Sequence, residues 1–341
     1  MSFTSSSDDR FSQLTHWLTT LATPRVRIDS LRPASADASF RRYFRVDADD
    51  GATYVVMDAP PPQEDVRPFI QVARLFGEAA ISVPHILAQD ATRGFLLLSD
   101  LGPTTYLDRL NHDSAHQLYM DAIDALILLQ VHSRPDALPE YDRAVLAREL
   151  ALFPDWYIGK HLDATLTANQ RADLDQVFDV ILANNLAQPQ VYVHRDYHSR
   201  NLMVMAKGNP GILDFQDALY GPITYDIVSL LRDAYIEWDE ELVLDWAIRY
   251  WERAKRAGLP VAPDIDRFYR DFEFMGLQRH LKVLGIFARL YHRDGKDGYL
   301  KDLPLVMQYT RKTASRYREL KPLLRLLDQL EDKAPQVGYT F

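Results

Sequence analysis

The sequence predicts an α+β fold with two unequal lobes, a small β-rich lobe over residues 1–100 and a larger, mainly helical lobe over residues 101–341. Two observations support this prediction. Short aromatic and β-branched runs dominate up to residue 99, whereas apolar residues at helical spacing dominate beyond residue 114. Between the two patterns, Ser99–Pro103 is rich in turn-forming residues and is the expected hinge.

The N-terminal lobe is expected to contain two helices and four strands. A first amphipathic helix is indicated by apolar residues at helical spacing, namely Phe11, Leu14, Leu18 and Leu21. A second helix is expected over 64–79, where one face carries Phe69, Val72, Ala73 and Phe76. The expected strands are Phe40–Val46, Thr53–Met57, Ile86–Ala88 and Phe95–Leu98, and Asp49–Gly51 forms a hairpin turn between the first two.

Helical patterns and proline breaks describe the second lobe. A helix is expected from Ser114 to His132, with an apolar stripe of Leu118, Ala122, Ala125 and Leu129. Short apolar strands over 191–193, 202–204 and 212–213 follow. Helices then recur to about Leu330, with breaks marked by Pro222, Pro260, Pro263, Pro304 and Pro322.

Composition limits the possible partners and compartments. The net charge of −9 argues against a general nucleic-acid surface, and the absence of cysteine excludes disulfides, zinc–thiolate sites and a thiol nucleophile. Met1–Arg10 is polar, unlike a signal peptide, and the apolar run Ala122–Val131 is too short to span a bilayer. We therefore expect a cytoplasmic globular protein without nucleic-acid or membrane partners.

The segment that carries chemistry is Val193–Val204, followed by Gly211–Asp217. It contains a His-Arg-Asp motif that ends at Asp196, and Asn201 follows five residues later. An Asp-Phe pair that begins at Asp214 then follows a short apolar run. This is the spacing of the catalytic and metal-binding residues of protein-kinase-like phosphotransferases. Each residue alone also fits an ordinary turn, but the complete set favours phosphoryl transfer.

Four segments extend the similarity to nearly the whole chain: Ser39–Arg45, Met57–Pro61, Leu98–Gly102 and His194–Asn201. With them the chain resembles the aminoglycoside phosphotransferase-like superfamily of small-molecule kinases, which shares the protein kinase fold. Within that superfamily it resembles the bacterial anomeric kinases of cell-wall recycling, which phosphorylate N-acetylmuramate and N-acetylglucosamine at C1.

The resemblance implies roles for individual residues. Asp196 is implied as the catalytic base that accepts the proton of the substrate hydroxyl. Asn201 and Asp214 are implied as ligands of Mg²⁺ bound with ATP. Asp100 and Leu101 match the hinge whose backbone meets adenine.

Five other residues have less specific expectations. Asp226 matches a common acidic position, where a helix cap or buried ion pair is preferred over catalysis. Asp217 could bind a second magnesium ion or a sugar hydroxyl, or it could be an ordinary turn residue. Tyr235 or Trp238 could stack on a sugar ring, or only fill the core. Arg232 could meet a substrate carboxylate.

Two departures from the wider kinase pattern concern the phosphates. No glycine-rich loop precedes the first hairpin, where Pro33–Ser39 contains small residues but no glycine. Met57 ends the strand that usually carries a phosphate-binding lysine, and Phe69 or Ile70 replaces the glutamate partner of that lysine. Losing both charges together is coherent, since a lone buried glutamate beside phosphates would repel them.

A different cation is then expected to face the phosphates. Alternation along a strand puts Arg41 and Arg45 on the opposite face from Arg42. Arg42 is the favoured candidate, because a guanidinium binds phosphate oxygens in a bidentate manner, and a solvated arginine at a strand edge is the alternative.

The sequence therefore predicts an ATP- and Mg²⁺-dependent kinase, expected to be a monomer, that phosphorylates an amino sugar at its anomeric hydroxyl. That hydroxyl is more acidic than an ordinary alcohol, so one aspartate base suffices. The alternatives are an aminoglycoside- or choline-type kinase and a nucleotide-binding pseudokinase. The missing lysine suggests a pseudokinase, whereas the intact Asp196, Asn201 and Asp214 argue against it.

Overall fold

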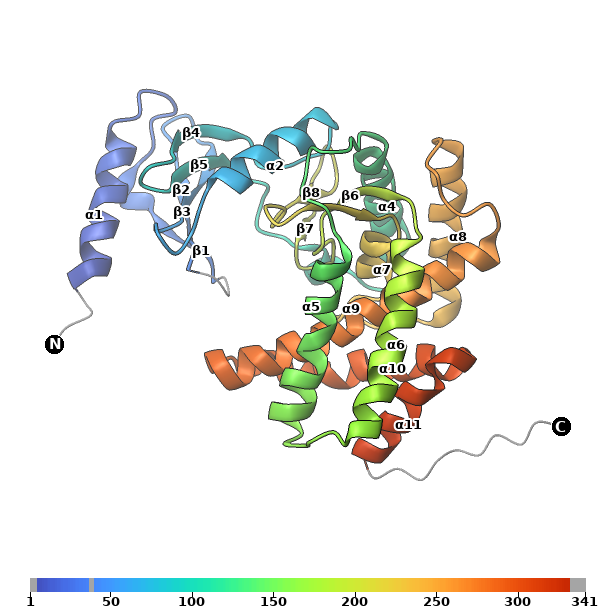
Figure 1. Cartoon of the computed structure of the whole chain (residues 1–341). Helices are drawn as coiled ribbons and strands as arrows, with labels where there is room; N and C mark the ends of the chain where they lie inside the picture. The colour runs from blue at the N-terminus through green and yellow to red at the C-terminus, as the bar shows by residue number, and fades with distance from the viewer. Residues whose placement is uncertain (1–4, 37–39, 332–341) are drawn as a thin grey trace. The chain divides into compact units, whose positions relative to one another are not determined.

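The computed structural model of the chain describes residues 5–36 and 40–331 (Figure 1). The chain divides into two compact units. Unit 1 comprises Met1–Thr105 and Asn201–Asp217, and unit 2 comprises Tyr106–Arg200 and Ala218–Phe341. The boundary expected at residue 100 did not anticipate that the segment 201–217 groups with the N-terminal unit.

Unit 1 contains a five-stranded antiparallel sheet in the order β1-β2-β3-β5-β4. The expected hairpin is present as β2 and β3, which pair from Arg42 opposite Asp58 to Asp47 opposite Thr53. Strand β1 was not predicted; it uses the first part of the small-residue segment, of which residues 37–39 lie outside the described residues. The strands are β1 (Arg32–Ala36), β2 (Arg42–Asp47), β3 (Thr53–Asp58), β4 (Ile86–Asp90) and β5 (Phe95–Ser99).

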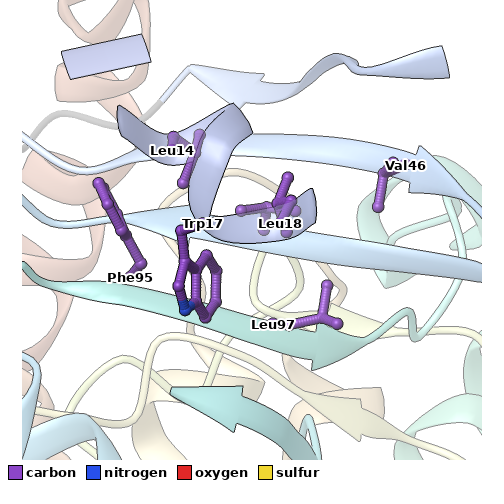
Figure 2. Close-up of a cluster of buried hydrophobic side chains, with 7 residues drawn as sticks. Leu14, Trp17, Leu18, Val46, Phe95 and Leu97 are labelled. Carbon is purple, nitrogen blue, oxygen red and sulfur yellow. The ribbon is translucent and has the colours of Figure 1, made fainter. Parts of the chain in front are cut away.

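Helix α1 (Ser5–Thr19) covers one face of this sheet. Leu14, Trp17 and Leu18 follow one another at helical spacing and are almost fully buried against sheet residues (Figure 2). Those sheet residues are Val46, Val56, Phe95 and Leu97. The helix ends at Thr19, so Leu21 packs against the cluster from beyond it. Val56 therefore faces α1, and by alternation Met57 faces the other side of the sheet.

The second helix, α2 (Arg67–Glu78), connects the segment 201–217 to unit 1. Phe69 and Phe76 on its buried face lie 4.7 and 5.7 Å from the ring of Phe215, measured between ring centroids. A backbone hydrogen bond of 2.7 Å from Ile212 to Ser82 adds to this packing. The Asp-Phe motif is thus anchored to unit 1 by its phenylalanine.

Unit 2 is mainly helical and is organised around the long helix α9 (Ile265–Asp294), shown in orange in Figure 1. Helix α9 contacts α5, α6, α7 and α10. The helices are α3 (Tyr106–Arg109), α4 (Ala115–Val131), α5 (Arg143–Leu152), α6 (Ala168–Leu186), α7 (Tyr225–Leu231), α8 (Glu240–Arg256), α9, α10 (Leu303–Arg316) and α11 (Lys321–Leu330), with a π-helix at Phe153–His161. Short 3₁₀ turns occupy Ile28–Ser30 in unit 1 and Asp297–Asp302 and Arg318–Leu320 in unit 2.

The proline breaks fall where helices begin or strands end. Pro222 ends a strand, Pro260 and Pro263 separate α8 from α9, and Pro304 and Pro322 lie in the first turns of α10 and α11. These first-turn positions tolerate proline because their backbone N–H groups have no intrahelical acceptor. Across residues 5–36 and 40–331, none of the helices combines the length and the apolar character needed to cross a bilayer.

Candidate active site

The loop that carries Asp196 follows β6 (Gln190–Val193), which pairs antiparallel with β9 (Leu219–Pro222) in unit 2. Asp226, in the first turn of α7, accepts hydrogen bonds from the backbone N–H groups of His194 at 2.6 Å and Arg195 at 3.0 Å. Burial raises the pKa of Asp226 to about 7, although both backbone donors act to lower it. The side chain of Asp226 therefore fixes the start of the loop, which is a structural role.

A second buried carboxylate, Asp233, fixes the other end of the loop. Its Oδ2 accepts hydrogen bonds from the backbone N–H of Ser199 at 3.0 Å and from the hydroxyl of that serine. Its Oδ1 accepts one from the backbone N–H of Tyr235 at 3.2 Å. Sequence reasoning missed Asp233, because no local pattern connects it to a loop more than thirty residues earlier.

The Asp196 carboxylate is partly open to solvent, with 41 % of its side chain exposed, and it lies beside cations. Arg279 of α9 places a guanidinium nitrogen 3.6 Å from Oδ1 of Asp196 and donates to the backbone oxygen of Arg195 at 2.8 Å. Desolvation acts to raise the pKa of Asp196, but Lys282, Arg279 and His198 outweigh it and hold that pKa below its usual range. Asp196 is therefore ionised at neutral pH and can accept a proton.

A buried ion cluster beneath the loop supplies part of this positive potential. Lys282 places Nζ 3.1 Å from Oε1 of Glu149 and donates to the hydroxyl of Tyr225 at 3.0 Å. Arg195, whose φ of +78° lies in the left-handed region, donates to the same Glu149 oxygen at 2.5 Å. Helices α5 and α9 thus hold the loop through charges that no sequence motif indicated.

The expected metal ligands come together in unit 1. Strands β7 (Leu202–Met203) and β8 (Gly211–Ile212) pair antiparallel, and the backbone N–H of Leu213 donates to the oxygen of Asn201 at 2.9 Å. This pairing puts Nδ2 of Asn201 3.5 Å from Oδ2 of Asp214. Gln216, which the sequence analysis did not single out, donates to Oδ1 of Asp214 at 2.7 Å.

The chemistry of this pair fits magnesium. Asp214 is exposed and has a φ of +62°, a strained backbone conformation of the kind that concentrates at functional sites. Within the described residues, no three His, Cys, Asp or Glu side chains gather into a metal-binding group. A carboxylate and an amide oxygen suit a cation that keeps water and substrate phosphates as its other ligands.

The three arginines of the first hairpin are distributed differently from the expectation. Arg42 donates to the fully buried Asp58 at 2.9 Å, and Asp58 also pairs with Arg10 of α1. Arg42 belongs to the same face of β2 as Phe44 and Val46, which pack toward α1. Arg42, the favoured cation for the phosphates, is thus hydrogen-bonded to Asp58 on the face of β2 that packs toward α1, and its phosphate contact stays a prediction.

Arg41 is electrostatically coupled to Asp214, one of the two expected metal ligands, and to Asp217. Its Nε donates to Glu64 at 3.0 Å. Desolvation acts to lower the pKa of Arg41, but Tyr43, Glu64, Asp214 and Asp217 outweigh it and raise that pKa above its ordinary value. Asp214 and Asp217 are therefore close enough to Arg41 to affect its pKa. Arg45 is instead hydrogen-bonded to Asp100.

Asp100 and Leu101, the residues expected beside adenine, follow β5, and Met57, at the position of the missing lysine, lies in β3. Met57 is buried on the face opposite α1. The Asp100 carboxylate accepts hydrogen bonds from Arg45 at 2.6 and 2.9 Å and from the Thr53 hydroxyl at 2.9 Å. These donors hold the pKa of Asp100 below its usual value against the opposing effect of desolvation. The Asp100 carboxylate is thus occupied by Arg45 and Thr53. A ligand here would be bound by the backbone of Asp100 and not by its side chain.

Leu101 packs closely against β8. A Cβ atom added to Gly211 would lie 3.0 Å from Cδ1 of Leu101 and 2.7 Å from Sδ of Met205. Only glycine fits there without a shift of the leucine. This close packing fixes the hinge residue Leu101 relative to the ribbon that carries Asn201 and Asp214.

The expected substrate residues have different surroundings. Arg232 is 5 % exposed and its guanidinium pairs with Glu273 at 3.1 Å. Its expected contact with a substrate carboxylate stays a prediction. Tyr235 lies beside the loop that carries Asp196, with its ring centroid 5.4 Å from that of His198. Asp217 is exposed at the end of the Asp-Phe segment of unit 1.

The sheet of unit 1, with one helix between its third and fourth strands, and the helical unit 2 with its His-Arg-Asp loop together define the α+β fold of protein kinases. A solved structure of an amicoumacin kinase in complex with AMP-PNP, Ca²⁺ and amicoumacin is similar, with a TM-score of 0.62 and 13 % identity over 91 % of this chain and 97 % of that one. The predicted fold class is confirmed.

Residues 30–259 match the Phosphotransferase enzyme family, and the chain belongs to that family. A protein of Neisseria meningitidis serogroup B named N-acetylmuramate/N-acetylglucosamine kinase is 52 % identical, over 96 % of this chain and 98 % of the relative. A protein of the same name from Pseudomonas aeruginosa is 49 % identical, over 96 % and 99 %. The predicted family and the prediction of an ATP-dependent kinase are confirmed.

Proposed function

We propose that this protein transfers the γ-phosphoryl group of ATP to the anomeric hydroxyl of N-acetylmuramate or N-acetylglucosamine. The observation that carries the proposal is the near-full-length identity, close to one half, with relatives named for these two sugars. We place the reaction in peptidoglycan recycling and the protein, as a monomer, in the cytoplasm.

Asp196 is the proposed catalytic base. As the oxygen of the C1 hydroxyl forms its bond to the γ-phosphorus, its proton passes to the Asp196 carboxylate, and the bond to the departing ADP oxygen breaks. The loop anchors Asp226 and Asp233 fix the position of the base, since its backbone neighbours are bound at both ends. Positioning of this kind accounts for much of the catalysis of phosphoryl transfer.

Asn201 and Asp214 are the proposed ligands of Mg²⁺, which would neutralise phosphate charge when bound with ATP. Gln216 holds the Asp214 carboxylate in place through its hydrogen bond. We further propose Arg41 in place of Arg42 as the cation that faces the phosphates, because Arg41 is coupled to Asp214 and Asp217. For adenine, we propose the backbone of Asp100 and Leu101, with Met57 beneath the ring.

A substrate panel tests this function. ADP release is measured with N-acetylmuramate, N-acetylglucosamine, their 1-O-methyl glycosides, an aminoglycoside and choline. We expect turnover with the two free sugars and loss of their reducing end, whereas the methyl glycosides stay unreacted because their anomeric oxygen is blocked. Turnover of the aminoglycoside or choline alone would replace the sugar assignment, and binding of ATP without turnover of any acceptor would indicate a pseudokinase.

A further inference from the structure

Arg200 is the last residue of the loop that carries Asp196. In the part of the chain that the structure describes, no carboxylate forms an ion pair with it, whereas Arg195, Arg232 and Arg279 each have one. Instead, the guanidinium carbon of Arg200 lies 3.6 Å from the ring centroid of Tyr235. A charge in this setting is available for an anionic ligand.

The platform under this guanidinium is held in place on several sides. The backbone of Tyr235 is bound by Asp233, and its ring packs against Phe287 with centroids 6.0 Å apart. Phe287 in turn packs against Tyr299, whose ring centroid is 5.7 Å from the Arg200 guanidinium carbon. Arg200 is therefore oriented by stacking in the way that pre-organises a binding arginine.

An unsatisfied acceptor lies on the same side of unit 2. Oδ2 of Asp302 is buried and has no hydrogen-bond partner among residues 5–36 and 40–331. Asp302 is close enough to Arg200 for the guanidinium to lower its pKa against the larger effect of desolvation, which raises that pKa. A guanidinium without an ion pair among the described residues, beside an orphan acceptor, suits a ligand that carries both a carboxylate and N–H or O–H donors.

Asp196 and Arg200 belong to one short loop. Four residues span at most about 14 Å between their Cα atoms. Both charges act on His198, since Asp196 raises its pKa and Arg200 lowers it, although desolvation has the largest effect and lowers it. A single sugar can therefore present its C1 hydroxyl to Asp196 and a substituent of another ring carbon to Arg200.

We propose that Arg200 binds the lactyl carboxylate that N-acetylmuramate carries on its C3 oxygen and so determines the preference between the two sugars. The Asp302 oxygen accepts a hydrogen bond from a donor of the same substrate. This inference rests on the proposed function and assigns to Arg200 the carboxylate contact that the sequence suggested for Arg232.

The experiment compares Arg200→Gln and Arg200→Lys with the unsubstituted protein, and Arg325→Gln, an exposed arginine of α11, is the control. The readout is the ratio of kcat/KM for N-acetylmuramate to that for N-acetylglucosamine. We expect Arg200→Gln to lower this ratio about 10- to 100-fold, the range of a charge-assisted hydrogen bond. Arg200→Lys lowers it less, because it keeps the charge but loses the planar fork, and Arg325→Gln leaves it unchanged.

A second experiment uses only the unsubstituted protein, so its result does not depend on whether a variant folds. The carboxamide of N-acetylmuramate keeps the shape of the lactyl group without its charge, so the unsubstituted protein should use it about 10- to 100-fold less well than the acid. An unchanged ratio in Arg200→Gln, or equal use of acid and carboxamide, would overturn the role of Arg200. If the unsubstituted protein turns over neither sugar, the proposed function itself is wrong. The experiment therefore distinguishes failure of the proposed function from failure of the role of Arg200.

Discussion

The two halves of the catalytic motif are built in different ways. In unit 1, Asn201 and Asp214 meet through the backbone pairing of a short ribbon, and Asp214 is exposed. In unit 2, the Asp196 loop depends on buried charges from distant helices, such as Glu149 and Lys282. The proposed metal ligands are thus positioned by local structure, whereas the proposed base is positioned by tertiary structure.

The largest expected effect is at the base. Asp196→Asn keeps the shape of the side chain but removes the basic oxygen, so turnover should fall about 10²- to 10⁴-fold. Nucleotide affinity should change little, because the nucleotide contacts are assigned to unit 1. Steady-state kinetics together with calorimetric titration of ATP measure both quantities, and near-normal turnover would show that Asp196 is not the base.

The next effect concerns the metal. Asp214→Ala should abolish the gain in ATP affinity that Mg²⁺ provides, since a carboxylate is the ligand that recruits this hard cation. Calorimetry with and without Mg²⁺ measures the gain. A gain that persists would place the metal elsewhere, with Asp217 the first residue to test.

A smaller difference is expected between neighbouring arginines. Arg41→Ala should weaken ATP binding or turnover more than Arg42→Ala, because Arg41 is electrostatically coupled to Asp214 and Asp217, whereas Arg42 lies on the face of β2 that packs toward α1. Thermal unfolding separates the effects, since Arg42→Ala leaves the buried Asp58 with one partner fewer and should lower stability. Met57→Lys should not restore a phosphate contact, because the glutamate partner is absent. Equal, negligible effects on ATP in both alanine variants would leave the phosphate contact unassigned.

The smallest effect is a shift in pH dependence. Nearby cations lower the pKa of Asp196, so removing one by Arg279→Met should raise it and move the acid limb of the kcat profile to higher pH. The sign follows because less positive potential stabilises the carboxylate less. Exposed Arg325→Met is the matched control. An unmoved acid limb would show that Arg279 does not act on the base.

The sequence predicted what is local. The spacing from Asp196 to Asn201 and Asp214, both helices of unit 1 and the hairpin could be read directly, because periodicity and turn residues encode them. Strand β1 was missed because small residues and a proline carry no strand pattern.

Contacts over long sequence separations could not be read in the same way. A phosphate contact was expected for Arg42 and a substrate carboxylate for Arg232. No local pattern showed their counterions Asp58 and Glu273, which are 16 and 41 residues away in the sequence. Asp233 and Lys282 were overlooked, since a charged residue in a helical pattern is ordinarily a solvated one. Burial turned these residues into parts of the scaffold.

The most direct measurement is phosphorus NMR of the product formed from N-acetylglucosamine, ATP and Mg²⁺. Transfer to the anomeric hydroxyl predicts a phosphorus signal coupled to the anomeric proton, as expected of a 1-phosphate. A signal coupled instead to the C6 protons would contradict phosphorylation at the anomeric hydroxyl while leaving the kinase assignment intact.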